Sequence, residues 1–257
     1  MNILDEICKK KIQEVEVLKK ERNFKLELKN KKQRDFLKTL ISDDKEKYNI
    51  IAEIKRKSPS RGIIRENFDL INIAQNYKKA GAKCLSILTE KNFFGGDISF
   101  IKKVKEKIEI PILRKDFILD EWQIYESNFY GADCILLILA ILDDSKLLRF
   151  YEIAKDLRMD VIFEVHDESE LSRALKHKLK CIGINNRNLK NLKIDLKTFN
   201  RLSQKIPEHV IKICESGIDC NNQLEEFSKQ GANAFLIGES LMKSNNIFES
   251  TKSLIKK

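Results

Sequence analysis

The sequence predicts an α/β fold, in the form of a single closed (βα)₈ barrel with an N-terminal helical extension. Three observations predict it. The chain has 257 residues, a length that suits one large α/β barrel. From residue 50 onward, eight short β-branched runs alternate with longer amphipathic segments. A Gly-Ala dipeptide introduces three of these runs, at positions separated by multiples of 50 residues.

The first 45 residues are expected to form the helical extension. Apolar residues recur near helical spacing at positions 3, 7, 12, 15 and 18, among many charges. A second short apolar set follows at positions 36, 37, 40 and 41. This spacing is typical of amphipathic helices. We therefore expect one domain over 1–257, in which 1–45 precedes the barrel.

The eight predicted strands occupy 50–55, 84–90, 110–116, 134–140, 160–166, 181–185, 210–215 and 234–238. Strands that alternate with helical segments indicate βαβ units and a parallel sheet. Eight such units in about 200 residues match a closed TIM barrel.

An internal repeat supports the barrel. The segments GAKC at 81–84, GADC at 131–134 and GANA at 231–234 each precede an apolar run. The glycine suits the left-handed position that ends a helix. A 50-residue period equals two βα units, which favours a barrel, although a doubly wound open sheet remains an alternative. No Gly-x-Gly-x-x-Gly follows an early strand, so a dinucleotide fold is disfavoured.

The composition indicates a soluble, cytoplasmic protein. The formal charge is +10, but lysines are spread along the whole chain, so we interpret them as solvated faces whose field helps to capture an anionic substrate. Six cysteines without a Cys-x-x-Cys pair suggest free thiols in a reducing compartment. The charged N-terminus is not expected to be a secretory signal, and the longest apolar run, 134–142, is too short to span a bilayer.

Polar residues end six of the predicted strands, where the active site of a parallel barrel lies. Glu53 and Lys55 are two residues apart, so they share one strand face with Ile51 and point into the barrel mouth. Lysines and glutamates crowded at one mouth shift each other's pKa, which suits general acid–base chemistry. The histidines are scattered and indicate no metal site. We expect His166 to lie on the strand face opposite Glu164, away from the site.

The last two strand ends predict a phosphate site. In ESGID at 215–219 and GESL at 238–241, small residues precede predicted helices. Backbone N–H groups can approach an anion at such positions, and the helix dipole favours negative charge. A phosphate site after strands seven and eight is a recurring feature of barrels.

These residues carry a family resemblance. The run IAEIKRKSPSRG at 51–62 closely resembles the N-terminal signature of the indole-3-glycerol-phosphate synthase family. Further similar segments are LTE at 88–90 with Phe94, LRKDF at 113–117, GINNR at 183–187, ESGI at 215–218 and IGESLM at 237–242. The resemblance covers nearly the whole chain. It implies closure of an indole ring with loss of CO₂ and water, in tryptophan synthesis.

The resemblance also implies roles for individual residues. Lys115 resembles the general acid that protonates the substrate ketone, and Glu164 its acid/base partner for the later dehydration. Lys55 would bind the substrate carboxylate and could also donate a proton. Glu53 and Asn185, with Glu215 nearby, would position the reacting hydroxyl. Which lysine acts at which step stays open.

The remaining matched positions would bind the substrate. Arg187 resembles a ligand of the anthranilate carboxylate. The aromatic ring would lie in an apolar slot formed by Phe94, Phe117 and Leu236. The positions that match the phosphate side are Ser58, Ser216, Gly217, Gly238 and Glu239, the last through its backbone N–H because its side-chain charge opposes a phosphate. No cofactor or metal is expected, since the ring itself stabilises the intermediate.

Two other functions remain open. Another phosphate-binding barrel, such as an isomerase of amino-acid biosynthesis, would explain the last two strand ends but not Glu53, Lys55, Lys115 and Arg187 together. A nucleic-acid-binding protein is suggested by charge alone, without a basic block interleaved with aromatics. We therefore expect a small phosphorylated substrate, with no nucleic-acid or membrane partner. The chain ends soon after the eighth helix, so a single activity is expected.

Overall fold

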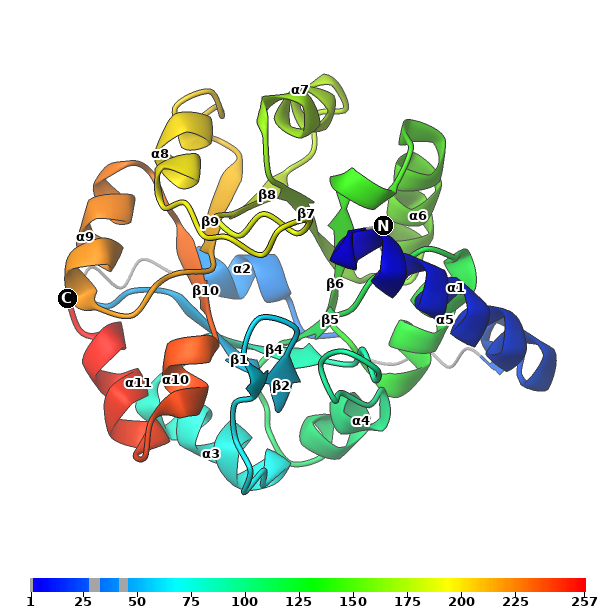
Figure 1. The fold of residues 1–257 in the computed structure, drawn as a ribbon, viewed down its shortest axis with the longest axis horizontal. Coiled ribbons are helices and arrows are strands. Elements are labelled where there is room, and N and C mark those ends of the chain that lie inside the picture. Colours follow the sequence, from blue (N-terminus) through cyan, green and yellow to red (C-terminus); the bar gives the residue numbers. More distant parts are fainter. Residues whose placement is uncertain (1, 28–32, 42–45) are drawn as a thin grey trace.

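The computed structural model describes residues 2–27, 33–41 and 46–257. Within them, eight parallel strands form a closed barrel, in the order β1-β10-β9-β8-β7-β6-β5-β4. Helices surround the strands on all sides (Figure 1). The predicted barrel is confirmed. Its strands are β1 (Ile50–Ile54), β4 (Cys84–Leu88), β5 (Ile112–Lys115), β6 (Cys134–Ile138), β7 (Asp160–Val165), β8 (Cys181–Asn185), β9 (Ile211–Glu215) and β10 (Ala234–Ile237).

Each barrel strand is followed by at least one helix in the described chain. The short hairpin of β2 (Lys57–Ser58) and β3 (Gly62–Ile63) lies in the loop after β1. The helices after the strands are α3 (Leu70–Ala80), α4 (Ser99–Lys105), α5 (Glu121–Tyr130), η2 (Leu139–Ile141), α6 (Asp144–Asp156), α7 (Glu168–Lys176), α8 (Lys197–Ser203), α9 (Asn221–Lys229), α10 (Glu239–Lys243) and α11 (Ile247–Ile255).

The Gly-Ala repeat marks helix ends, as predicted. Gly81 ends α3 and Gly131 ends α5, both in the left-handed conformation with φ of 104° and 93°. Gly231 follows α9 with φ 93°. A side chain is strained at such values, whereas glycine is not. The repeat therefore positions the turn into β4, β6 and β10.

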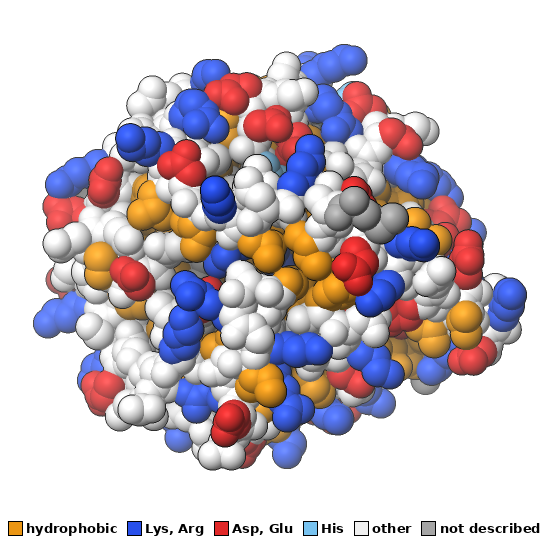
Figure 2. All heavy atoms as spheres, in the orientation of Figure 1, with side chains coloured by type: hydrophobic (Ala, Val, Ile, Leu, Met, Phe, Trp, Pro, Cys, Tyr) orange, Lys and Arg blue, Asp and Glu red, His pale blue; other side chains and the backbone are white. Residues whose placement is uncertain are grey.

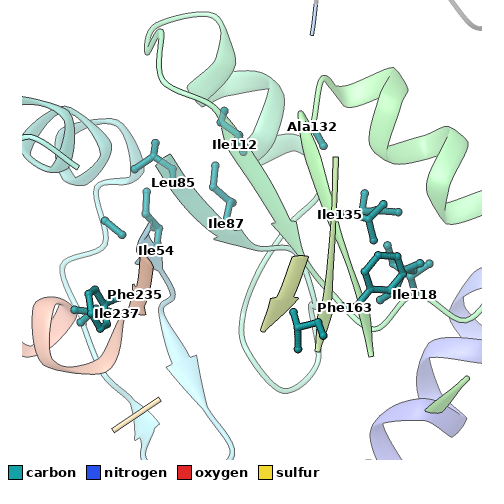
Figure 3. Close-up of a cluster of buried hydrophobic side chains, with 14 of the residues drawn as sticks. Ile54, Leu85, Ile87, Ile112, Ile118, Ala132, Ile135, Phe163, Phe235 and Ile237 are labelled. Carbon is teal, nitrogen blue, oxygen red and sulfur yellow. The ribbon is translucent and has the colours of Figure 1, made fainter. Parts of the chain in front are cut away.

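Strand alternation divides the apolar side chains into two cores. Ala52 and Ile54 face outward and belong to the core under the surrounding helices. Figure 3 shows Ile54 of this core together with Ile87 and Ile135. Ile51 faces inward, as predicted, with Cys84, which is buried and free like Cys134, Cys181 and Cys214. Cys8 is partly buried and Cys220 is exposed, and both are also free.

The N-terminal segment covers both ends of the barrel. Helix α1 (Ile3–Glu21) and helix α2 (Phe36–Leu40), which are the two predicted pieces, are separated by η1 (Phe24–Glu27). Phe36 and Leu40 of α2 are fully buried in the inner core, and the backbone N–H of Leu37 donates to Asp160 at the start of β7 (2.9 Å). Helix α2 therefore plugs the amino end of the barrel, while α1 packs at the carboxyl end. The predicted end of the extension at residue 45 lies outside the described residues.

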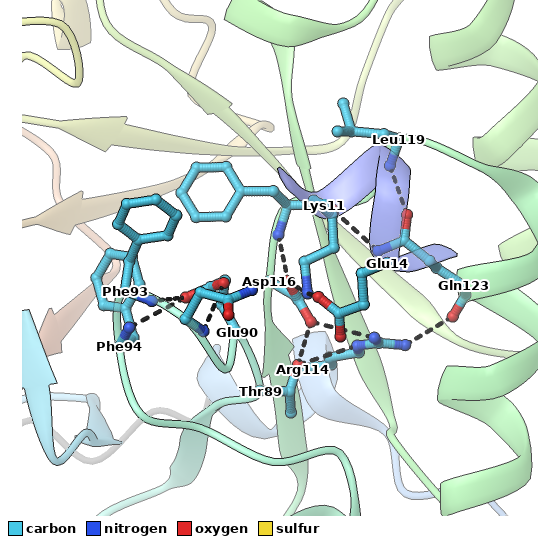
Figure 4. Close-up of polar contacts among 12 residues, drawn as sticks. Lys11, Glu14, Thr89, Glu90, Phe93, Phe94, Arg114, Asp116, Leu119 and Gln123 are labelled. Carbon is cyan, nitrogen blue, oxygen red and sulfur yellow. Dashed lines mark hydrogen bonds and ion pairs between the residues drawn. The ribbon is translucent and has the colours of Figure 1, made fainter. Parts of the chain in front are cut away.

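Helix α1 is fastened by a buried ionic network. Lys11 forms ion pairs with Asp116 (3.2 Å), just after β5, and with Glu14 (3.0 Å). Asp116 in turn accepts from Thr89 and pairs with Arg114 (Figure 4). Lys11 and Asp116 are almost completely buried. A buried charge is costly unless it is paired, so this network fixes α1 against the strand that carries Lys115.

Candidate active site

A cavity of about 700 Å³ opens at the carboxyl ends of the strands. On the face that carries α1, hydrophobic side chains gather near the centre, with lysines and arginines beside them (Figure 2). All fifteen sequence-predicted site residues line this cavity, namely Glu53, Lys55, Ser58, Phe94, Lys115, Phe117, Glu164, Asn185, Arg187, Glu215, Ser216, Gly217, Leu236, Gly238 and Glu239. The predicted convergence of these residues is therefore present.

Lys115, the last residue of β5, lies between two carboxylates. Its Nζ is 2.8 Å from Oε2 of Glu164 on β7 and 3.6 Å from Oε2 of Glu215 on β9. Burial lowers the pKa of Lys115, but the Glu164 and Glu215 carboxylates outweigh it and hold the pKa well above its usual range. Lys115 is thus an ammonium group at neutral pH, with a proton available to donate.

The pKa values of the two carboxyl groups are shifted in opposite directions. Burial raises the pKa of Glu164, but Lys115 and His166 together lower it well below its usual range. Burial, which the Lys115 charge only partly offsets, raises the pKa of Glu215 to about 8. These directions favour Glu164 as the anionic carboxyl of the pair and Glu215 as the protonated one. Neighbouring carboxyls with separated pKa values can act as an acid and a base in one site.

Two glycines make room for the buried carboxylates. A Cβ atom on Gly183 would lie 2.2 Å from Oε1 of Glu215, and one on Gly238 would lie 2.4 Å from Oε1 of Glu53. Contacts this short are excluded for a real side chain. Both positions therefore require glycine for the carboxylates to keep their places.

Lys55 and Glu53 form a second pair at the same mouth, with 2.6 Å between Nζ and Oε1. The end of β1 directs both side chains into the cavity, as their alternation predicted. Asn185 at the end of β8 donates from Nδ2 to Oε1 of Glu164 (3.2 Å). Its Oδ1 accepts from the backbone N–H of Arg187 (2.9 Å), so one amide orients both the carboxylate and the arginine.

An apolar region lies beside these charges. Phe94 and Phe117 have ring centroids 6.1 Å apart and are tilted by 38°. Leu236 and, from helix α1, Leu4 and Ile7 line the same cavity. Leu4 and Ile7 were not among the predicted site residues. The region can accommodate a flat aromatic ring away from water.

The loops after β9 and β10 carry the residues predicted for the anion side, and both reach the cavity. Ser216 and Gly217 both have positive φ, of 69° and 82°. The Ser216 carbonyl accepts from Asn186 Nδ2 (3.1 Å), and Ser240 Oγ donates to the Ile218 carbonyl (2.9 Å). The Ser240 bond joins the two loops, and the Asn186 bond ties the loop after β9 to the end of β8. Helices follow both segments, as predicted: α9 begins at Asn221, a short turn after residues 216 and 217, and Gly238 directly caps α10.

The side chain of Glu239 forms ion pairs with basic side chains. Its Oε1 accepts from Arg61 (2.8 Å) and Lys243 (2.7 Å), and its Oε2 pairs with Arg187 (3.2 Å). This acidic group therefore neutralises positive charge at the rim. Ser58, also on this side, has its Oγ 3.3 Å from that of Ser60.

The expected strand face of His166 is wrong, although His166 does not line the cavity. Residues two apart share a strand face, so His166 lies on the same side as Glu164, with 3.1 Å between its Nε2 and Oε1 of the carboxylate. The same alternation that placed Glu53 and Lys55 on one strand face, applied to residues 164 and 166, would have predicted this contact.

Among the described residues, no group of three or more His, Cys, Asp or Glu side chains could hold a metal ion. No described helix is long and apolar enough to cross a bilayer.

Comparisons with known proteins agree with this geometry. The family model described as indole-3-glycerol phosphate synthase matches residues 4–254. The protein of that name from Legionella pneumophila (strain Paris) is 45% identical, over 99% of this chain and 98% of its own. The one from Caldanaerobacter subterraneus subsp. tengcongensis is 54% identical, over 78% of each chain. A solved 3-hexulose-6-phosphate synthase shares the fold alone, with a TM-score of 0.63 and 16% identity over 80% of this chain and 97% of that one. The chain belongs to the indole-3-glycerol phosphate synthase family.

Proposed function

We propose that this chain acts as a carboxy-lyase of tryptophan biosynthesis, converting 1-(2-carboxyphenylamino)-1-deoxyribulose 5-phosphate to indole-3-glycerol phosphate. The observation that carries the proposal is the ion pair of Lys115 with Glu164, which lies in one cavity with an apolar region and an anion side. We further propose a cytoplasmic location, supported by the free state of all six cysteines.

Substrate binding is proposed to bring the two reacting carbons together. The phosphate would bind backbone N–H groups of the loops at Ser216, Gly217, Gly238 and Glu239, on the side of Ser58. The anthranilate carboxylate would bind Lys55 and Arg187, with the ring between Phe94, Phe117 and Leu236. Anchoring a flexible molecule at two ends restricts its conformers, and well-oriented intramolecular reactions reach effective molarities of roughly 10⁵ M or more.

Ring closure is proposed to use Lys115 as the general acid. The aromatic carbon that bears the carboxylate forms a bond to the ketone carbon, and the ketone oxygen takes the Lys115 proton to become a hydroxyl. A positioned ammonium stabilises the charge that develops on this oxygen. Loss of CO₂ returns the electron pair of the broken C–C bond to the ring and restores its aromaticity.

Dehydration completes the sequence. The new hydroxyl takes a proton from the Lys55 ammonium and leaves as water. Glu164, as the anion, accepts a proton from the CH₂ carbon next to the nitrogen, which forms the indole double bond. Glu53 and Asn185 position the hydroxyl in this step, and Glu215 lies nearby. Neither oxidation nor reduction occurs, so the proposed steps use the side chains alone.

The test is turnover of the purified chain with this substrate. Indole fluorescence at the product wavelength should rise, with one CO₂ released per indole formed. An isomerised product without ring closure would instead indicate another phosphate-binding barrel. Tight nucleic-acid binding at physiological salt, with no turnover, would overturn the proposal.

A further inference from the structure

His166 lies between two carboxylates at the end of β7. Its Nε2 is 3.1 Å from Oε1 of Glu164, and its Nδ1 is 3.0 Å from Oε2 of Glu170 on α7. The side chain of His166 is 10% exposed. The described residues that line the cavity include Glu164 but not His166. His166 can therefore influence the cavity only through the carboxylate that it contacts.

Glu170, which contacts Nδ1 of the His166 ring, is itself held in place by hydrogen bonds. Oε2 of Glu170 also accepts from the backbone N–H of His166 (2.8 Å). The backbone N–H of Glu170 donates to Oδ1 of Asp167, the cap of α7 (2.9 Å). The start of this helix thus fixes Glu170, and Glu170 fixes the plane of the imidazole.

The two contacts favour a charged ring. A neutral imidazole has one N–H and presents a lone pair from its other nitrogen, whereas an imidazolium presents N–H groups on both sides. A neutral ring would therefore place a lone pair against one of the carboxylates. Burial lowers the pKa of His166, but Glu164 and Glu170 outweigh it and raise the pKa to about 10.

The other groups around Glu164 come from three further strands. Lys115 of β5 contacts Oε2 at 2.8 Å, and Asn185 of β8 donates to Oε1 at 3.2 Å. Glu215 of β9 is 3.6 Å from the Lys115 ammonium. The Glu164 carboxylate is thus shared between two cations, Lys115 on one oxygen and His166 on the other. The His166 contact is an ion pair rather than an aligned hydrogen bond.

We infer that His166 is a positioning residue: as an imidazolium between Glu164 and Glu170, it holds the Glu164 carboxylate as an anion turned toward Lys115. The inference rests on the proposed function, because it gives His166 a part in the reaction assigned to these two residues. Without the His166 cation, only Lys115 would neutralise the Glu164 carboxylate. The proton affinities of Lys115 and Glu164 would then change.

The charge state is tested directly by ¹⁵N NMR of the imidazole rings, with His166→Gln used to assign the resonances. Both His166 nitrogens should be protonated at pH 7.5, and the titration midpoint should lie above pH 8.5. Glu170→Gln should lower that midpoint by at least one pH unit. A neutral His166 ring at pH 7.5 would overturn the inference.

Kinetics test the positioning role. His166→Gln should lower kcat about tenfold and leave KM within about twofold, and Glu170→Gln should lower kcat in the same direction. His177→Gln is the matched control, because His177 also pairs with a carboxylate, Asp144 (2.9 Å), but outside the cavity. It should leave both constants unchanged.

The outcomes separate the two proposals. A wild-type chain without turnover would overturn the proposed function and the positioning role together. An active wild type with unchanged kcat in folded His166→Gln would overturn the positioning role alone.

Discussion

Gly183 on β8 leaves the space that the Glu215 carboxylate of β9 fills: a Cβ atom at position 183 would lie 2.2 Å from Oε1 of Glu215 and 3.0 Å from Cγ2 of Ile162. The neighbouring strands are in direct register at this level, with Gly183 opposite Ile213 and Asn185 opposite Glu215. Gly183, which has no side chain, thus determines where the Glu215 carboxylate can lie.

Gly183→Ala should therefore lower kcat at least tenfold, because the methyl group displaces the Glu215 carboxylate. The measurement is steady-state turnover, with circular dichroism to show that the barrel still folds. The double variant with Glu215→Gln should be no worse than Glu215→Gln alone, since both changes remove the same interaction. Strictly additive losses would show that Gly183 acts through something else.

The second prediction concerns pH and Glu215. An unfolded glutamate ionises near pH 4.5, whereas Glu215 in the fold keeps its proton to about pH 8. Between these values the unfolded chain binds fewer protons than the folded chain, so the free energy of unfolding falls as pH rises. Urea denaturation of the wild type and Glu215→Gln should show this fall in the wild type relative to the variant. Parallel stability curves from pH 4.5 to 8 would contradict it.

The third prediction concerns Glu239, which binds three cations at the proposed anion side. Its negative charge opposes a phosphate, so Glu239→Gln should strengthen competitive inhibition by inorganic phosphate about threefold. Glu225→Gln is the control, because Glu225 also pairs with a lysine four residues later but lies outside the cavity. Unchanged or weaker phosphate inhibition in Glu239→Gln would contradict the idea that this carboxylate competes with the substrate.

The fourth prediction concerns the attachment of α1. Lys11→Met leaves the buried Asp116 without one of its cations, which should cost about 3 kcal/mol of unfolding free energy. KM should rise, because Leu4 and Ile7 of α1 line the cavity. Lys9→Met, at an exposed position of the same helix, should change neither quantity. Wild-type stability and KM in Lys11→Met would show that the network does not fasten α1.

The fold could be predicted because its signals are local. Strand runs, the Gly-Ala repeat and the alternation of Ile51, Glu53 and Lys55 each depend on neighbours a few residues away. The barrel then brings the strand ends together by geometry, so polar residues that end separate strands meet in one cavity. This is why residues predicted one strand at a time share a site.

Other features carried no local signal. The pairing of Lys11 with Asp116 joins residues about a hundred positions apart, and nothing near either residue in the sequence identifies the other as its partner. The ion pairs of Glu239 likewise depend on where the loop with Arg61 folds back. His166 is a different case, because the correct alternation was available and was misapplied. The individual roles in the reaction remain predictions.

The central claim is that the Lys115 ammonium, paired with Glu164, protonates the substrate ketone. The most direct measurement is single-turnover formation of indole-3-glycerol phosphate by Lys115→Met, followed by fluorescence. We predict a normally folded protein that still binds the substrate but forms product at least a thousandfold more slowly. A folded variant that keeps about half of the wild-type rate would contradict the claim.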